Sequence, residues 1–311
     1  MEKMGVEMLT RHDEEGYEGR ELILYEEARL QIKEIIQNIK KNLPFSISPF
    51  QKTVSRIIDS LISESGDVLY NKALHIDRTP SLDLSSNMVN VCIFAIEIGM
   101  GLNYRRDDLE RLALAAILHD IGMAKVDEDI LKKPERLTVE EFNIVKKHTE
   151  YGAGILKGLG RDVLWMSEII PREHERLNGR GYPNGLKDGE IHEYALIIGI
   201  ADIYEALTHH RFHRKPLLPL DAMKEILTVE RESFPERIIK AAISKLPVFP
   251  AGSKVRLNSN EIGIVICTND LSPFRPTVEI ILDSSGRKPR TKRIINLREN
   301  PLLFIVSQVY D

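Results

Sequence analysis

LALAAILHDIGMAKV, residues 112–126, decides the fold, because an apolar helix ends there with an imidazole beside a carboxylate. His119 and Asp120 then stand at the inner end of a core helix, which Gly122 is expected to terminate. Charge in such a place is costly unless it is paired or binds a metal, and a carboxylate can bridge two cations. One buried face is predicted by apolar residues that recur at helical spacing: Leu109, Leu112, Ala113, Ala116 and Ile117.

Composition places the chain among globular proteins. Its 311 residues are 42% hydrophobic and 29% charged, enough for a sizeable core in two or three units. The net charge of -4 gives no bulk attraction to polymeric nucleic acid or to an anionic membrane. No signal peptide and no run of about 18 apolar residues is found, so no membrane span is expected. Cys92 and Cys267 lie in apolar runs and are expected to be buried and reduced, which favours a cytoplasmic protein.

Hydrophobic periodicity divides the chain into three regions. Residues 1–75 carry helical patterns without chemistry, which favours a regulatory or dimerisation region. Residues 76–246 continue as a helical domain, and residues 247–311 read as a small β domain. The predicted fold class is therefore mainly α, a helical bundle with a metal site between N-terminal helices and a C-terminal β domain. The basic run RKPRTKR, 287–293, favours a solvated hairpin over a phosphate-binding arm. Four strands are predicted: Val255–Leu257, Ile262–Ile266, Thr277–Leu282 and Leu303–Val306.

A second histidine is expected to point into the bundle. Thr138 and Glu141 have the spacing of a capping box and predict the start of a helix. On this helix His148 would share a face with Phe142 and Val145, because residues three apart are neighbours.

Further along, polar side chains again interrupt buried faces or stand at their ends. Imidazole and carboxylate ligands without a thiolate suit iron, manganese, zinc or nickel. Bundle helices that each give one or two ligands can build a dinuclear site. Such a site suits displacement at phosphorus, because a water that bridges two cations becomes hydroxide near neutral pH. The set is His119, Asp120, His148, His174 and Asp202.

These residues, together with EHERLNGRGYPNGL at 173–186 and IADIYEALTHHR at 200–211, resemble the HD-GYP domain over about residues 70–230. The resemblance implies a bacterial phosphodiesterase that hydrolyses cyclic di-GMP to the linear dinucleotide or GMP with a metal-activated hydroxide. It implies two divalent ions, iron or manganese, with Asp120 as the bridge. The metal ligands that it implies are His119, Asp120, His148, Glu173, His174 and Asp202.

The resemblance also assigns residues to substrate and catalysis. Asp120 and Lys125 would be catalytic, and Glu175 would orient a metal ligand. Arginine suits the substrate phosphate because its planar fork can pair with two oxygens. The substrate-binding residues implied are Gly181, Tyr182, Arg211 and Arg214.

The chain departs from the family at three motifs. Glu173 replaces the first histidine of HHE, Met123 replaces the lysine of HDIGK, and Ser85-Ser86 stands for HS. These departures support an alternative, a catalytically weak or inactive domain that binds cyclic di-GMP or a signalling protein as a sensor. A phosphohydrolase for another nucleotide is the third hypothesis, because the site rather than the fold determines function. A homodimer is left open.

Overall fold

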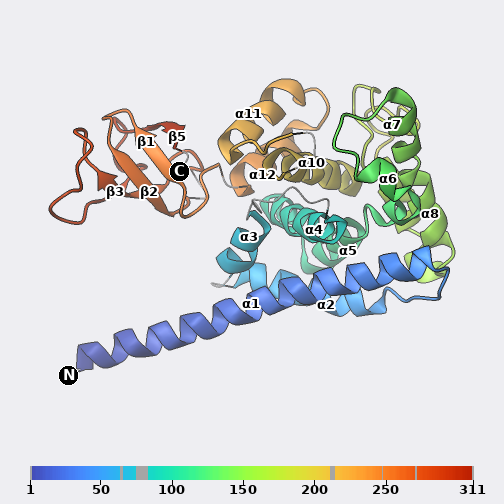
Figure 1. Cartoon of the computed structure of the whole chain (residues 1–311), viewed down its shortest axis with the longest axis horizontal. Helices are drawn as coiled ribbons and strands as arrows, with labels where there is room; N and C mark the ends of the chain where they lie inside the picture. Colours follow the sequence, from blue (N-terminus) through green and yellow to red (C-terminus); the bar gives the residue numbers. More distant parts are fainter. Residues whose placement is uncertain are drawn as a thin grey trace.

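The computed structural model describes residues 2–63, 66–74, 83–210, 214–246, 248–269 and 272–309, with side chains from residue 19 onward except at 66 and 67. A helical body, α1 to α12, precedes a β domain, β1 to β5 (Figure 1). The predicted fold class, mainly α with a small C-terminal β domain, is confirmed. The division of the chain at residues 75 and 246 stays a prediction.

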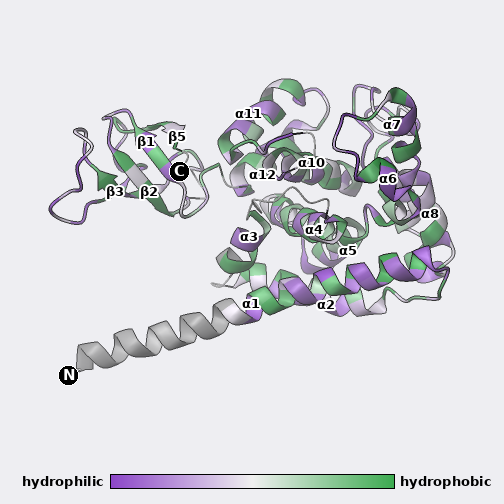
Figure 2. Ribbon diagram, in the orientation of Figure 1, coloured by the Kyte–Doolittle hydropathy of each residue, from purple (hydrophilic) through white to green (hydrophobic). Residues whose placement is uncertain are grey.

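Three helices form the N-terminal layer: α1 (Glu2–Lys40), α2 (Ser48–Ile62) and α3 (Gly66–Leu74). Helix α1 runs along one side of the body beside α2 and also packs against α4 (Figure 1). Polar and apolar residues alternate along its described part (Figure 2), as expected for a helix with one buried side. The buried side comprises Leu24, Tyr25, Ala28, Ile32, Ile35 and Ile39.

The centre of the body is built from α4 (Leu84–Gly101), α5 (Arg106–Ile117) and α10 (Glu193–Thr208). Helix α4 packs against both α5 and α10. By length and composition α4 is apolar enough to cross a membrane, but 72% of it is buried inside the protein. The helix is interrupted by Ser, Asn and Glu residues and is not the uninterrupted apolar run that was sought in the sequence. Helix α4 is apolar on all sides because it packs against other helices on several sides.

The remaining helices surround this centre. Helices α6 to α8 lie at one end of the body, and α11 and α12 lie beside α10 (Figure 1). The helix predicted over 163–170 is broken into short turns around Pro171 and Gly160, since proline cannot continue a helix from the interior. These elements are η1 (Ile121–Lys125), α6 (Glu128–Leu131), α7 (Val139–Lys146), α8 (His148–Lys157), η2 (Arg161–Val163), α9 (Met166–Ile169), η3 (Ile170–Arg172), α11 (Pro219–Val229) and α12 (Glu236–Lys245).

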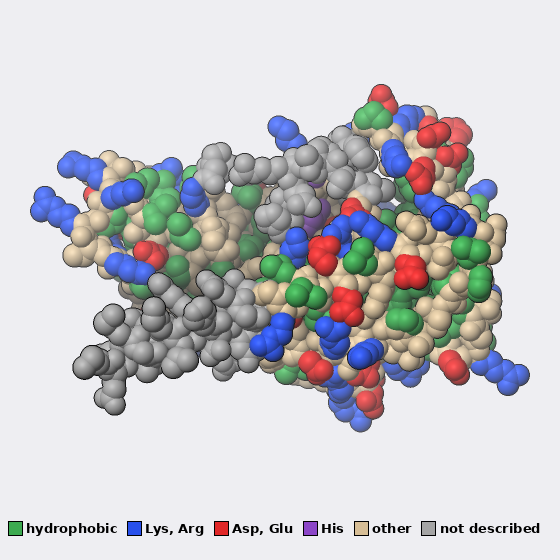
Figure 3. Space-filling view, turned by 60° about the horizontal axis from the view of Figure 1, so that its bottom comes forward, with side chains coloured by type: hydrophobic (Ala, Val, Ile, Leu, Met, Phe, Trp, Pro, Cys, Tyr) green, Lys and Arg blue, Asp and Glu red, His purple; other side chains and the backbone are tan. Residues whose placement is uncertain are grey.

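The β domain is one antiparallel sheet with strand order β4-β3-β2-β1-β5. Four strands were predicted and β4 was missed, since it has only three residues. The basic segment 287–293 is mostly exposed between β3 and β4, as predicted, and Lys and Arg side chains project from this domain (Figure 3). Cys92 is buried, but Cys267 is exposed, against the expectation. The strands are β1 (Lys254–Leu257), β2 (Ile262–Cys267), β3 (Thr277–Leu282), β4 (Ile294–Asn296) and β5 (Ile305–Gln308).

Candidate metal centre

His119 and Asp120 lie just beyond the end of α5. The sequence predicted that the two residues would be the last residues of the helix. The helix ends at Ile117 instead, so both residues occupy the turn before η1. The imidazole Nδ1 of His119 lies 2.8 Å from the carbonyl oxygen of Ala116. A proton on Nδ1 donates to this carbonyl, so that in the neutral ring the lone pair of Nε2 is directed into the site.

Gly122 allows η1 and α8 to approach closely. A Cβ at this position would lie 1.9 Å from the carbonyl oxygen of His148 and 2.5 Å from the amide nitrogen of Gly152. Only glycine fits such an approach between two backbones. Because Gly122 has no side chain, the turn that carries Asp120 can lie against the start of α8, which carries His148.

His148 is buried at the first position of α8. The capping box of Thr138 and Glu141 is confirmed, but α7 ends at Lys146, so His148 begins a new helix. Its Nδ1 lies 2.7 Å from the carbonyl oxygen of Val145, the same arrangement as in His119. Phe142, expected on the buried face, is 45% exposed. The break at Lys147 separates His148 from the helix that carries Phe142.

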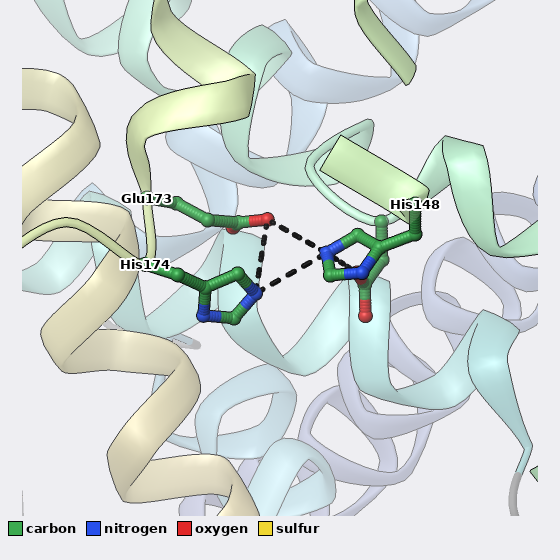
Figure 4. A group of neighbouring side chains, drawn as sticks. His148, Glu173 and His174 are labelled. Atoms are coloured by element: carbon green, nitrogen blue, oxygen red, sulfur yellow. Dashed lines mark hydrogen bonds and ion pairs between the residues drawn. The ribbon is translucent and has the colours of Figure 1, made fainter. Parts of the chain in front are cut away.

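Glu173 and His174 complete one cluster from the end of η3. His174 Nε2 lies 3.2 Å from His148 Nε2 and 3.6 Å from Glu173 Oε1. Glu173 Oε1 is also 3.8 Å from His148 Nε2, and the three side chains converge in Figure 4. Together with Asp120, they offer four ligand atoms that all lie within 4.8 Å of one another.

Asp120 connects this cluster to a second pair. Its Oδ1 lies 3.3 Å from His148 Nε2, and its Oδ2 lies 3.5 Å from His119 Nε2. Asp202, on α10, places Oδ1 4.0 Å from the same His119 nitrogen. All six residues predicted as metal ligands therefore come together, with the Asp120 carboxylate between two groups.

Burial and mutual charge shift the pKa values of these residues. Burial alone would lower the pKa of His119, but the carboxylates of Glu173 and Asp120 raise it to about 10. Against the same effect of burial, Asp120 and Glu173 raise the pKa of His148 to about 9. Burial, and then the nearby His148, hold the pKa of His174 well below its usual value.

The donor set fits divalent cations. His119 Nε2, Asp120 Oδ1 and both carboxylate oxygens of Glu173 are buried without a hydrogen-bond partner among the described residues. Buried polar atoms normally have partners. Two imidazoles fixed through Nδ1, with carboxylates and no thiolate, are the ligands that iron, manganese or zinc would take.

The glycine-rich loop after η3 is fixed by Glu175. This buried carboxylate accepts hydrogen bonds from the backbone N–H groups of Asn184, at 2.7 Å, and Leu186, at 2.9 Å. Glu175 therefore holds the loop, whereas the sequence predicted that it would orient a metal ligand. Gly181 packs so closely that a Cβ would lie 2.4 Å from Glu175 Cα. The next residue, Tyr182, stacks its ring on His174 with centroids 4.5 Å apart.

The other predicted residues are less directly connected to the cluster. Lys125 is exposed at the end of η1 and makes no ion pair with the residues that the structure describes. Arg214 donates a hydrogen bond to the carbonyl oxygen of Ala206. Arg211 lies outside the described residues. The roles predicted for these three residues stay predictions.

Sequence reasoning missed a buried polar network behind α10. Glu205 accepts a hydrogen bond from Asn87 Nδ2 at 2.8 Å, and Asn90 Nδ2 lies 3.4 Å from the same carboxylate. Tyr25, on α1, donates its hydroxyl proton to Asn90 at 2.7 Å. Ser85 instead bonds to Asp83, the N-cap of α4. Two asparagines three residues apart in an apolar helix were the signal that could have revealed this network.

A hollow of about 340 Å³ opens beside the cluster. His174 and Tyr182 border it on one side, and Glu230 and Ser233 border it near the end of α11. Arg180 also lines the hollow. The site is therefore accessible next to its least buried histidine.

Comparison with known proteins points to one family. The family model described as an HD domain matches residues 69–235, and a KOW domain associated with HD domains matches residues 254–310. A cyclic di-GMP phosphodiesterase of Pseudomonas aeruginosa is 28% identical over 73% of this chain and 55% of its own length. A 3′3′-cGAMP-specific phosphodiesterase of Vibrio cholerae is 24% identical over 78% of this chain and 45% of its own length. The chain thus spans about half the length of these relatives.

A solved structure supports the same fold. An HD-GYP-type protein from Bdellovibrio bacteriovorus superposes with a TM-score of 0.58 at 18% identity, over 73% of this chain and 71% of that one. At this level of identity the likeness concerns the fold.

Proposed function

Because the chain belongs to the HD domain family, and within it to the HD-GYP proteins, we propose that it is a metal-dependent phosphodiesterase of cyclic dinucleotides. Cyclic di-GMP is the substrate that we propose first, and 3′3′-cGAMP is the second candidate, because a relative is named for it. The observation that carries the proposal is the convergence of four buried polar atoms, from His119, Asp120 and Glu173, that have no hydrogen-bond partner in the described part of the chain.

We assign two divalent ions, iron or manganese, to this site. Asp120 would lie between them, with His119 and Asp202 on one side and His148, Glu173 and His174 on the other. When bound, such ions would make water nucleophilic near neutral pH and neutralise the charge of phosphate oxygens.

The residues of the chain would prepare the site in three ways. Hydrogen bonds from Nδ1 orient the rings of His119 and His148, so less side-chain entropy would be lost when a ligand binds. Burial of Glu173 removes its carboxylate from bulk water and would strengthen its electrostatic attraction to a bound cation. Tyr182 closes one side of His174 by stacking on it.

The proposal is tested on anaerobically purified protein. Metal content is measured by elemental analysis, and hydrolysis of cyclic di-GMP and of 3′3′-cGAMP is followed on the same sample by chromatography. We expect about two iron or manganese ions per chain and a linear product, as in a two-metal site. A chain without metal that forms no product would overturn the proposal.

A sensor is the alternative, and Met123 is the observation that favours it, because the lysine of the family motif is missing from η1. Two bound ions, tight binding of the cyclic dinucleotide and no product would identify a sensor. The assays above distinguish the two functions.

A further inference from the structure

A row of side chains leads from α7 to the metal cluster. The ring of Tyr182, which stacks on His174, also meets the ring of Phe142 edge to face, with centroids 6.3 Å apart. Lys146 holds its ammonium nitrogen 4.8 Å from the centroid of Phe142 and 5.1 Å from that of Tyr182. We refer to Phe142 and Lys146, on α7, together with Tyr182 of the glycine-rich loop, as the α7 rim. The rim borders a candidate metal ligand through direct ring contact.

The position of the rim relative to the cluster is fixed by the backbone. Nδ1 of His148 lies at hydrogen-bond distance from the carbonyl oxygen of Val145. The hydroxyl of Thr149 donates a hydrogen bond to the carbonyl oxygen of Lys146 at 2.9 Å. Both hydrogen bonds span the break between α7 and α8. A ligand that occupies the cluster and the rim together would therefore meet a preformed surface.

The charge of Lys146 is not compensated by an acid. Two other lysines in this part of the chain form ion pairs, Lys132 with Glu128 and Lys133 with Glu141. Among the residues that the structure describes, no carboxylate forms an ion pair with Lys146; its contacts are the two ring faces. A cation–π contact at an exposed site contributes only about 0.5–1 kcal/mol and leaves the positive charge available.

Phe142 has a surface available for stacking. Phe142 is 45% exposed, although large aromatic side chains are usually buried. A nucleobase that stacks on an aromatic ring gains about 1–3 kcal/mol. An exposed ring beside an uncompensated ammonium group is the combination that a nucleotide, with its flat base and its phosphate, would occupy.

We propose that the α7 rim binds the half of the substrate that is not cleaved, with Lys146 paired to the second phosphate and Phe142 stacked on a purine base. The inference rests on the proposed function, because it needs a ligand with two phosphates. A cyclic dinucleotide places one phosphate at the metal cluster and must place the other outside it. Lys146 supplies a cation without an ion pair to any described carboxylate, 5.1 Å from the centroid of the Tyr182 ring that stacks on His174.

The experiment compares substitutions of two adjacent lysines in the metal-loaded chain. Lys146→Gln removes the ammonium from the rim, whereas Lys147→Gln removes an exposed ammonium one residue away. KM and kcat for cyclic di-GMP, metal content and the dissociation constant of the dinucleotide are measured at several salt concentrations. We expect Lys146→Gln to raise KM and the dissociation constant about tenfold, in line with one charged hydrogen bond, and to weaken their salt dependence. Lys147→Gln should match the wild type.

Two further variants separate charge from packing. Lys146→Arg keeps the charge and should recover most of the affinity. Phe142→Leu keeps an apolar side chain but removes the flat ring, so the dissociation constant should rise while its salt dependence stays as in the wild type.

Each contrary result has one meaning. If the wild type binds the dinucleotide and Lys146→Gln binds it equally well, the rim does not hold the second phosphate and only this inference fails. If Lys146→Gln loses metal, or lowers kcat at an unchanged KM, Lys146 has a structural role and the inference also fails. If the wild type neither binds nor hydrolyses a cyclic dinucleotide, the proposed function fails, and this inference fails with it.

Discussion

The carboxylate of Glu175 accepts the backbone N–H of Asn184 at 2.7 Å, across the loop that presents Tyr182 to the metal cluster. A second bond to the N–H of Leu186 uses the other oxygen. The contact explains why an acid follows His174: it closes the glycine-rich loop from inside. Gly181 permits this closure, since any Cβ there would meet the backbone of Glu175.

Glu175→Gln should destabilise the loop. An amide offers one acceptor oxygen where the carboxylate offers two, so one of the two backbone N–H groups is left without its partner. Hydrogen bonds to a charged group contribute about 1.5–3 kcal/mol, and we expect a loss of about 2 kcal/mol in the free energy of unfolding. Urea denaturation measures this loss. Glu150→Gln, at an exposed position on α8, is the control and should change little; equal losses for both variants would contradict the loop-fixing role.

Gly122→Ala should be far more damaging than a second glycine substitution nearby. The added Cβ would overlap the carbonyl oxygen of His148, so η1 and α8 must separate. We expect a loss of at least about 3 kcal/mol, as for other strained core substitutions, together with lost metal. Gly154→Ala, on α8 with nothing within 4 Å of its Cβ, should instead stabilise by up to about 1 kcal/mol. Thermal unfolding compares the pair, and a tolerated Gly122→Ala would disprove the close approach.

Apolar periodicity was sufficient to predict the helical body, because α5 and α10 bury residues at helical spacing. It could not predict where a helix turns: His148 was assigned to the helix of Phe142, although α7 ends at Lys146. Lys147, between the two helices, keeps right-handed helical dihedrals, and no glycine or proline marks the break in the sequence. The exposure of Phe142, on the same short helix as the buried Val145, was also missed.

The cluster itself was predictable from residue types, and its details were not. Motif order placed His119, Asp120 and Asp202 together, since each stands at the end of a buried face or on one. The role of Glu175 depends on a loop that returns to it nine and eleven residues later. Such a return has no periodicity, so no local pattern could reveal it. The network of Tyr25, Asn90 and Glu205 joins three helices that are far apart in the sequence, so only the asparagines on α4 hinted at it and not their partners.

Glu173→Ala should remove metal. Both oxygens of this buried carboxylate lack hydrogen-bond partners among the described residues, and one oxygen faces two imidazoles. We expect at least one of about two ions per chain to be lost, by elemental analysis. Glu173→His restores the family residue and should retain the metal. Glu168→Ala, at an exposed position on α9, is the control. An unchanged metal content in Glu173→Ala would show that Glu173 is not a ligand.

Metal affinity should rise with pH. In the metal-free chain the carboxylates of Glu173 and Asp120 outweigh burial and raise the pKa of His119 to about 10 and that of His148 to about 9. Both rings therefore carry a proton at pH 7, and a cation must displace it, because only neutral imidazole is a ligand. Each displaced proton makes the affinity for Mn²⁺ rise about tenfold per pH unit below the pKa. Calorimetry at pH 6, 7 and 8 measures the slope, which should be smaller in His148→Ala; a flat profile would contradict the raised pKa values.

Met123→Lys should raise turnover if the chain is an attenuated enzyme. Met123 lies half-buried in η1, three residues beyond Asp120, where its own backbone N–H donates to the Asp120 carbonyl oxygen at 2.9 Å. A lysine there would bring positive charge to the edge of the cluster, where negative charge develops on a phosphate. The loss of one such donor lowers kcat by about 10²–10³ in enzymes that use it, so we expect kcat to increase about tenfold or more. Met123→Leu is the matched apolar control and should leave kcat and metal content unchanged. If Met123→Lys binds the dinucleotide and its metal as before without any gain in kcat, the missing lysine does not limit the reaction, and the sensor becomes the better account of the chain.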